Sequence, residues 1–151
     1  MKRTIIPGVV DGNQKLCCLP GSATALEAAK VMRDRRMGAV MVVEGERLRG
    51  IVTERDLVTR LLAEGHDPAG TSLVAIMTPR PMTLAPGDTA KEALDRMLEG
   101  HYRHLPVLDG DRIVGMVSIR DLFDAVRRSL QEELQTAETL IFGEPYGLAT
   151  H

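Results

Sequence analysis

Hydrophobic and polar positions follow the same order in two blocks of the chain. Each block opens on a short apolar run, at residues 16–19 and 82–84, that predicts a strand. A T-x-x-E pattern follows, from Thr24 and from Thr89, which is typical of the capping box that begins an amphipathic helix. Two β-branched runs around a Gly-centred polar turn then predict a hairpin, and another helix follows. Each block is therefore a β-α-β-β-α unit.

The two blocks are copies of one another. Residues 24–57 align with residues 89–122 at a constant offset of about 65, and 13 of the 34 pairs are identical. Chance would give roughly two identities at ordinary residue frequencies. A unit of about 60 residues has only a marginal core of its own, so we expect the copies to pack together. The predicted fold class is α+β (mixed α/β), with two tandem repeats arranged as a pseudo-two-fold pair.

The duplication divides the chain into five segments. These are an N-terminal lead-in (residues 1–13), repeat 1 (14–64), an ordered connector (65–81), repeat 2 (82–128) and a C-terminal helical extension with a tail (129–151). The connector contains few Gly or Ser residues and its apolar positions predict a short helix at residues 72–77.

The last predicted helix is longer than repeat 2 needs. A helix of about 20 residues is about 30 Å long. Gly143 is a stop signal at its end. We expect the distal part to fold back over its own core, to contact another subunit or to meet a separate partner. The apolar stripe consists of Leu122, Val126, Leu130, Leu134, Ala137 and Ile141.

Composition and charge narrow the class of protein. The chain is 44% hydrophobic and 26% charged, as folded domains are, and a net charge of −2 with 3% aromatic residues argues against a nucleic-acid binder. No apolar run is long enough to span a bilayer and the first residues lack a signal-peptide core, so we expect a cytoplasmic protein with no membrane partner. The adjacent Cys17 and Cys18 should be reduced thiols that fill a strand.

The densest group of chemistry-bearing residues lies where each hairpin ends. The segments are GIVTERD at residues 50–56 and GMVSIRD at residues 115–121. In one interpretation, Thr53 and Ser118 are N-caps and the aspartate three residues later completes a capping box. In the other, the helix N–H groups and the hydroxyl bind phosphate, the arginine adds charge, and the carboxylate accepts hydrogen bonds from a sugar diol. The spacing alone leaves both interpretations open.

These segments, together with two further motifs, resemble a tandem pair of CBS domains, also called a Bateman module. The motifs are Met77-Thr78-Pro79 in the connector and Arg103-His104-Leu105-Pro106-Val107 at the start of a strand, and the resemblance covers about residues 14–128. It implies an adenosyl ligand, namely AMP, ADP, ATP or S-adenosylmethionine, bound in clefts between the repeats, and a homodimer shaped as a flat disc.

The resemblance also implies roles for particular residues of the two turns. Thr53 and Ser118 occupy positions that contact nucleotide phosphate, and Asp56 and Asp121 occupy positions that hold the ribose hydroxyls. By the same resemblance, two groups of residues line the adenine pocket. One group lies just before the turn that follows the first strand of a repeat, and the other lies at the start of the hairpin. That role nominates Met82 and Thr83 with Leu105 and Pro106, but plain core packing is the favoured interpretation of these four.

Charge near the turns nominates further ligand-binding residues. Residues 101–104 are richer in cationic and polar groups than the matching stretch of repeat 1 and should lie close to Arg120, so we expect a polyphosphate to prefer the second cleft. The first cleft has small side chains that leave room for a base. The candidates added on these grounds are Arg55, Arg103, His104, Arg120, Gly38 and Ala39.

Catalytic and metal-ligating patterns are not evident. No ordered Ser/His/Asp set, activated Cys/His pair or acidic cluster stands out. His101 and His104 form H-x-x-H at the start of a strand, but no third ligand is near them in the sequence. We therefore expect neither a catalytic residue nor a bound metal.

The sequence predicts a regulatory protein and not an enzyme. We expect a stand-alone module that requires no cofactor, binds an adenine nucleotide or S-adenosylmethionine, and passes the signal to a partner protein that the sequence does not identify. The alternative is an interaction or structural protein with non-binding clefts, in which Thr53 with Asp56 and Ser118 with Asp121 serve only as helix caps.

Overall fold

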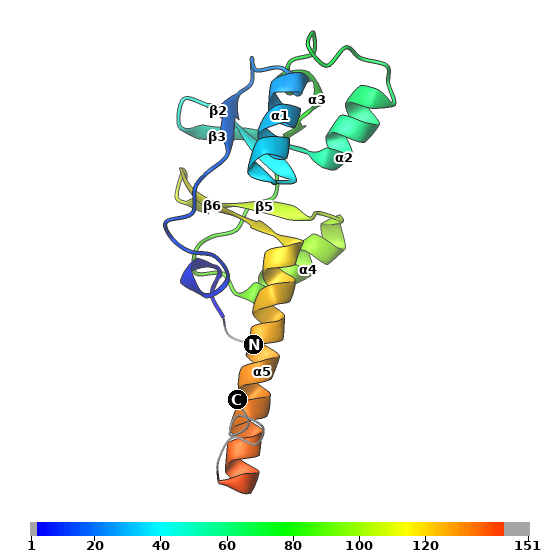
Figure 1. Ribbon diagram of the computed structural model, residues 1–151. Coiled ribbons are helices and arrows are strands. Elements are labelled where there is room, and N and C mark those ends of the chain that lie inside the picture. The colour runs from blue at the N-terminus through cyan, green and yellow to red at the C-terminus, as the bar shows by residue number, and fades with distance from the viewer. Residues whose placement is uncertain (1–2, 144–151) are drawn as a thin grey trace.

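Repeat 1 forms a four-stranded sheet in the computed structural model, which describes residues 3–143 (Figure 1). The strand order is β1-β2-β3-β4; β1 is parallel to β2 and the other pairs are antiparallel. This confirms the predicted order of elements, although β1 begins at Cys18 and not at residue 16. The elements are β1 (Cys18–Pro20), α1 (Ala25–Arg35), β2 (Ala39–Glu44), β3 (Arg47–Thr53), α2 (Glu54–Asp56), η2 (Leu57–Leu62), α3 (Leu73–Ile76) and β4 (Thr78–Pro79).

Repeat 2 has the same order with a smaller sheet. Its elements are α4 (Ala90–Gly100), β5 (His104–Asp109), β6 (Arg112–Ser118) and α5 (Ile119–Phe142), and its sheet holds only β5 and β6. The strand predicted at residues 82–84 is wrong, because only Leu84 pairs, through a single parallel bridge to Val107. Pro81 has no N–H to donate, and a turn closed by the Asp88 N–H on the Ala85 carbonyl (3.1 Å) begins directly after Leu84.

The helix starts follow from the sequence pattern. Thr24 with Glu27 and Thr89 with Glu92 form complete capping boxes, in which each threonine hydroxyl accepts from the N3 backbone N–H and each glutamate accepts from the N-cap N–H. The predicted boxes are thus confirmed, and they place the two helices at equivalent points of the two repeats.

The two sheets face each other at the centre of the molecule, with the helices on the outer sides (Figure 1). Ala39, Met41 and Ile51 of repeat 1 are at most 5% exposed and pack with Met116 of repeat 2. Met41 and Met116 therefore fill the core between the repeats.

The N-terminal segment belongs to the core of repeat 2. Ile5 and Val9 of the helical turn η1 (Ile5–Val9), with Val10 after it, are buried in one cluster with Leu84, Met97, Leu105, Val107, Val117, Leu122 and Ala125. The sequence placed residues 1–13 in a lead-in; within it, Ile5, Ile6, Val9 and Val10 pack in the core of repeat 2. The connector supplies α3 and β4 to repeat 1.

The side chain of Gln14 completes the outer edge of the smaller sheet. The Met116 N–H donates to Gln14 Oε1 (2.8 Å), and Gln14 Nε2 donates to the Met116 carbonyl (3.0 Å). In repeat 1 the equivalent residue, Ile51, pairs with Thr78 of β4. An amide side chain thus satisfies the backbone groups of β6 where repeat 2 has no fourth strand.

Helix α5 extends well beyond the body of repeat 2 (Figure 1). Its predicted end at Gly143, a left-handed C-cap, is confirmed. The buried residues of α5 are Leu122, Ala125 and Ser129, so the possibility that its distal part folds back over its own core is wrong for the described residues. None of the described helices is both long and apolar enough to cross a membrane.

Candidate functional site

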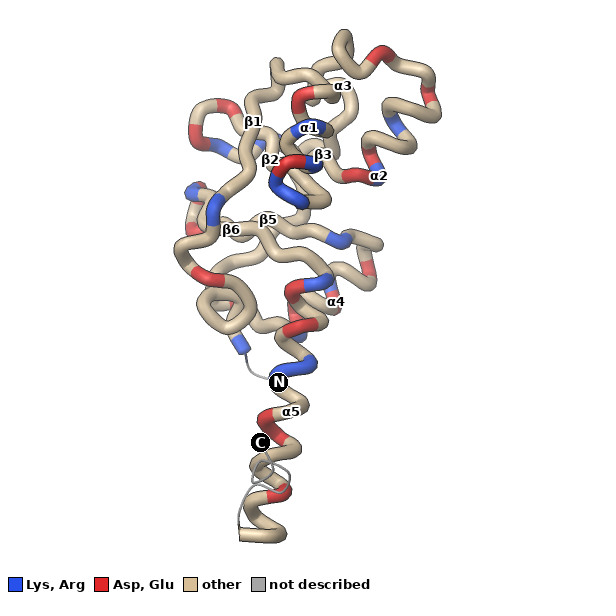
Figure 2. Tube along the Cα trace, viewed as in Figure 1, with Lys and Arg blue, Asp and Glu red and all other residues tan. Residues whose placement is uncertain are grey.

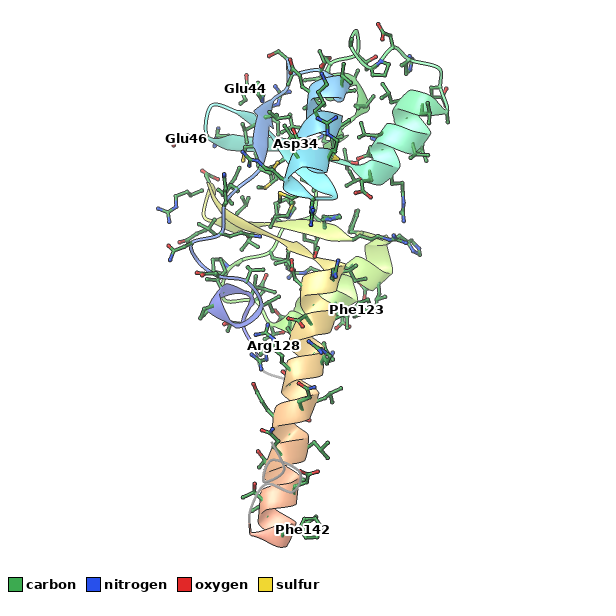
Figure 3. The ribbon with its side chains drawn as sticks, viewed as in Figure 1. Asp34, Glu44, Glu46, Phe123, Arg128 and Phe142 are labelled. Carbon is green, nitrogen blue, oxygen red and sulfur yellow. The ribbon has the colours of Figure 1, made fainter. Side chains whose placement is uncertain are left out.

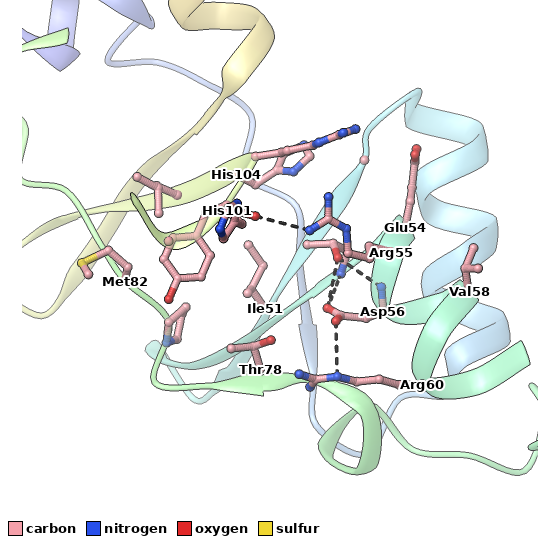
Figure 4. A pocket seen from close by; sticks show the side chains of 17 residues that line it. Ile51, Glu54, Arg55, Asp56, Val58, Arg60, Thr78, Met82, His101 and His104 are labelled. Carbon is pink, nitrogen blue, oxygen red and sulfur yellow. Dashed lines mark hydrogen bonds and ion pairs between the residues drawn. The ribbon is translucent and has the colours of Figure 1, made fainter. Parts of the chain in front are cut away.

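A cavity of about 480 Å³ opens between the repeats (Figure 4). One wall is the end of β3 with the start of the α2–η2 helix, residues 53–60, and the opposite wall is the end of α4 with the start of β5, residues 100–105. Gly38, Ile51, Thr78, Pro81 and Met82 complete the lining. The cavity is of a size that holds a small organic ligand.

Asp56 is the buried carboxylate of this cavity, with 8% exposure. Its Oδ2 accepts hydrogen bonds from the Thr53 N–H (2.9 Å) and the Thr53 hydroxyl (3.1 Å), while the Asp56 N–H donates back to that hydroxyl (3.2 Å). Ser118 and Asp121 form the equivalent box in repeat 2. The capping interpretation is confirmed at both turns, and it leaves open whether either carboxylate also holds a ligand.

The second oxygen of the Asp56 carboxylate faces Arg60, one helical turn later. Arg60 Nε lies 3.6 Å from Asp56 Oδ1 (Figure 4). Arg60 Nη1 donates to the Met77 carbonyl at 2.9 Å. This arginine therefore links the carboxylate to the connector between the repeats. A ligand hydroxyl that binds Asp56 Oδ1 would compete only with this long ion pair.

Cationic groups outnumber anionic ones around the cavity. Arg55, Arg60 and Arg103 line it against Glu54 and Asp56. Arg55 Nη1 also donates to the His101 carbonyl across the repeats, at 3.4 Å, a long hydrogen bond that a ligand can displace (Figure 4). An excess of guanidinium groups favours an anionic ligand such as a phosphate.

The remaining lining is apolar. Ile51, Val58, Met82 and Leu105 contribute aliphatic surface, and Tyr102 contributes an aromatic ring. A cavity lined by both guanidinium groups and apolar side chains suits a ligand that has an anionic group joined to a flat organic ring.

His104 stands where the cavity meets the junction of the repeats. Burial is the main cause that lowers the pKa of its imidazole below the usual 6.5, and Arg103 acts in the same direction. Glu54 and Asp121 raise that pKa, by a smaller amount. His104 Nδ1 is buried without a hydrogen-bond partner among the described residues. A Cβ on Gly38 would lie 3.0 Å from His104 Nε2, so the glycine leaves the space that the imidazole occupies.

We expect His104 to make the protein less stable in acid. Because the folded chain holds this imidazole neutral, the unfolded chain binds the proton more readily, and the free energy of unfolding falls as the pH drops below about 6.5. In His104→Gln that decrease should be smaller. Urea denaturation across this pH range measures it, with His66→Gln, at an exposed histidine, as the control. Equal pH slopes in wild type and His104→Gln would contradict the assignment.

Some of the nominated ligand-binding residues line the cavity, and others lie outside its lining. The nominated residues that line the cavity are Gly38, Thr53, Arg55, Asp56, Arg103 and His104, with Met82 and Leu105 of the adenine-pocket group. The nominated residues outside its lining are Ala39, Thr83, Pro106, Ser118, Arg120 and Asp121. Ala39 is buried between the sheets, and the Thr83 carbonyl accepts a hydrogen bond from Arg96.

The stretch at residues 101–104 lies at both turns. It lines the cavity of the Thr53 turn. It also leads into β5 beside the second turn, where His104 pairs with Ser118 and the Ile119 N–H donates to the Arg103 carbonyl (2.8 Å). The two sheets pack face to face, so the start of β5 in repeat 2 reaches the β3–α2 turn of repeat 1. The expected preference of a polyphosphate for the second cleft stays a prediction.

Sequence reasoning missed two lining residues of chemical interest, Arg60 and Thr78. Arg60 was detectable in principle, since it follows Asp56 by one helical turn, the spacing at which side chains of a helix meet. Thr78 belongs to the connector motif, and only the pairing of β4 with β3 brings it to the cavity.

A comparison with protein families matches the CBS domain twice, at residues 13–63 and 73–128. Among curated proteins, the chain is 33% identical over 129 residues to the meiotically up-regulated gene 70 protein of Schizosaccharomyces pombe, covering 85% of this chain and 18% of that protein. It is 33% identical over 118 residues to the CBS domain-containing protein YhcV of Bacillus subtilis, covering 78% of this chain and 82% of that protein. The chain spans only about a fifth of the first relatives it matches, 18% to 21% of their length.

Solved structures share the arrangement of both repeats. A signal-transduction protein with CBS domains from Burkholderia ambifaria, itself described as putative, superposes with a TM-score of 0.76 at 31% identity, covering 82% of this chain and 93% of that one. A CBS domain protein from Pyrobaculum aerophilum, solved in complex with AMP, gives a TM-score of 0.68 at 25% identity, covering 79% and 95% of the two chains.

Proposed function

The chain belongs to the CBS-domain family, and from that premise we propose that it is a regulatory module that binds an adenine nucleotide in the cavity beside Thr53 and Asp56. The observation that carries the proposal is the composition of this cavity, in which guanidinium groups and apolar side chains from both repeats line one space. The AMP complex of the Pyrobaculum aerophilum relative supports an adenine nucleotide as the ligand class.

Each part of such a ligand has a counterpart in the cavity. Arg55 and Arg103 offer guanidinium groups to phosphate oxygens, and Asp56 Oδ1 offers an acceptor to a ribose hydroxyl. The aliphatic and aromatic side chains of the lining suit an adenine ring. S-adenosylmethionine carries a sulfonium and an amino group, so the same arginines favour phosphorylated ligands over it.

We propose that binding changes the relative position of the repeats. The ligand would touch residues of both, and Asp56 is linked through Arg60 to the connector carbonyls. A ligand biases such an arrangement only to the extent that its affinity differs between two states. The proposal includes a partner protein that responds to this change. It also includes a regulatory role without catalysis.

A thermal-shift series tests the ligand. Millimolar AMP, ADP and ATP should raise the melting temperature, and S-adenosylmethionine should raise it less; a ligand at about 100 times its Kd stabilises the native state by about 2.7 kcal/mol. NAD completes the series. No shift with any member would favour the alternative, an interaction protein with non-binding clefts, which the two complete capping boxes also accommodate.

Arg103→Gln should weaken binding of ATP by about tenfold, because a charge-assisted hydrogen bond to phosphate contributes about 1.5 kcal/mol or more. Isothermal titration calorimetry measures the loss. The matched control is Arg112→Gln, the same change at an exposed arginine outside the cavity lining. An unchanged Kd in Arg103→Gln, or an equal loss in the control, would contradict the assigned role.

A further inference from the structure

Glu54 brings an unpaired carboxylate to the cavity between the repeats. Among residues 3–143 its side chain forms neither an ion pair nor a hydrogen bond, although it belongs to the cavity lining. Asp56, the other carboxylate of the lining, accepts hydrogen bonds from Thr53 and faces Arg60. Figure 2 shows acidic and basic residues side by side at the start of α2. Glu54 is therefore the carboxylate whose charge remains available to act on a ligand.

Glu54 lies close to the groups assigned to phosphate. It directly precedes Arg55 in the chain, and Figure 4 shows the two side chains on the same wall of the cavity. A Cβ on Gly38 would lie 3.5 Å from Glu54 Oε1 and 3.0 Å from His104 Nε2, so the carboxylate and the imidazole approach the same point. Arg103 directly precedes that histidine. A phosphate held by Arg55 and Arg103 would therefore lie within the electrostatic reach of Glu54.

The charges of the lining match a single phosphate group. Arg60 and Asp56 face each other at 3.6 Å, so their charges offset one another. Arg55 and Arg103 remain, and together they balance a phosphate monoester, which carries a charge of about −1.5 to −2 at neutral pH. Each further phosphate adds negative charge, whereas the lining contains no lysine and no fourth arginine. Glu54 repels that added charge.

Repeat 2 shows that the helix start does not require this carboxylate. The residue equivalent to Glu54 is Ile119, and both turns form complete capping boxes. Ile119 packs against the core of repeat 2, whereas Glu54 is exposed and lines the cavity. A glutamate in the first turn of a helix also gains stability from the helix dipole. A test of Glu54 must therefore separate its effect on ligand binding from its effect on stability.

We propose that Glu54 is a specificity-determining residue, whose charge lowers the affinity of this cavity for a nucleoside triphosphate relative to the corresponding monophosphate. The inference rests on the proposed nucleotide function and names the ligand class that the site disfavours. Repulsion acts through space without contact, and it grows with each phosphate that the ligand carries. A site discriminates by such unfavourable interactions with a competing ligand as well as by contacts to the preferred one.

Calorimetric titration with AMP and with ATP tests this role, in the presence of a chelator so that no divalent cation offsets the ligand charge. Glu54→Gln keeps the size of the side chain and removes its charge. It should improve the affinity for ATP by about fivefold relative to that for AMP, as expected for an exposed charge that acts through solvent. The matched control is Glu46→Gln at the β2–β3 turn, which Figure 3 shows on the side of repeat 1 away from α2. The control should leave the ratio of the two affinities unchanged.

The ratio of ATP to AMP affinity decides the outcome. An equal ratio in wild type and Glu54→Gln would overturn the proposal, because a merely structural role changes stability and leaves the ratio unchanged. A loss of ATP affinity in the variant would also overturn it, since the carboxylate would then contact the ligand. At about 1 M salt, where charges act over only about 3 Å, the difference between wild type and variant should largely disappear. A wild type that binds neither nucleotide overturns the proposed function as well, whereas binding with an unchanged ratio overturns this inference alone.

Discussion

Replacing Ile5 by alanine is expected to lower the free energy of unfolding by about 2–5 kcal/mol, as truncation of a large buried side chain does. Ile5 is fully buried and belongs to the same cluster as Leu84, Met97 and Leu105. Truncation would leave a cavity among these side chains, and the backbone of the segment is tied to its neighbours by the Ile5 N–H, which donates to the Asp88 carbonyl at 2.8 Å. Urea denaturation with a tryptophan-independent probe, such as circular dichroism, measures the change.

The neighbouring Ile6→Ala is the matched control. Ile6 is only partly buried against the same cluster, so the same chemical change should cost clearly less. A loss below about 1 kcal/mol in Ile5→Ala would show that the N-terminal segment is dispensable for the core of repeat 2.

Asp56→Ala is expected to reduce nucleotide affinity by about 10–100-fold, the range of a hydrogen bond to a charged group. The carboxylate lies in the cavity lining, and its Oδ1 is restrained only by Arg60 at 3.6 Å. Asp121→Ala removes the equivalent cap from repeat 2 but lies outside that lining, so it should leave affinity nearly unchanged. Both variants should lose about 0.5–2 kcal/mol of stability, because both lose a capping interaction.

Calorimetric titration of both variants, with denaturation curves for each, separates three outcomes. Loss of affinity in Asp56→Ala alone supports the cavity beside Thr53. Loss in Asp121→Ala alone would assign the ligand to the second turn, against our proposal. If both variants lose stability and wild type binds no nucleotide, the two turns are caps and the protein acts through other surfaces.

Much of the fold was predictable because its signals are local. The T-x-x-E pattern at Thr24 forms a capping box whatever surrounds it, since all its hydrogen bonds lie within one turn. The hairpins follow from β-branched runs around glycine turns, and Gly45 and Gly110 indeed have positive φ values of 63°. Because the two repeats are copies, the same pattern supports each of these predictions twice. The comparisons and the structure agree on a tandem pair.

Predictions failed where pairing depends on residues far apart in the chain. Leu84 looked like part of a strand but forms one bridge, because the edge beside β5 is closed by a turn on one side and Pro81 on the other. Ile5 looked like part of a lead-in and Gln14 like the start of repeat 1, yet Gln14 satisfies the backbone of Met116 in repeat 2, 102 positions away. Nothing in the pattern of the first 14 residues specifies that partner.

The sequence alone determined the repeat, the order of elements, the helix caps and the length of α5, because these depend on spacing within one element or its copy. It also nominated Thr53, Asp56, Arg103 and His104 one by one. Only the tertiary structure decided that these four line the same cavity, because face-to-face packing of the sheets directs the strand start of one repeat at the turn of the other. That packing brings residues of the two repeats together. The spacing of residues within either repeat does not indicate it.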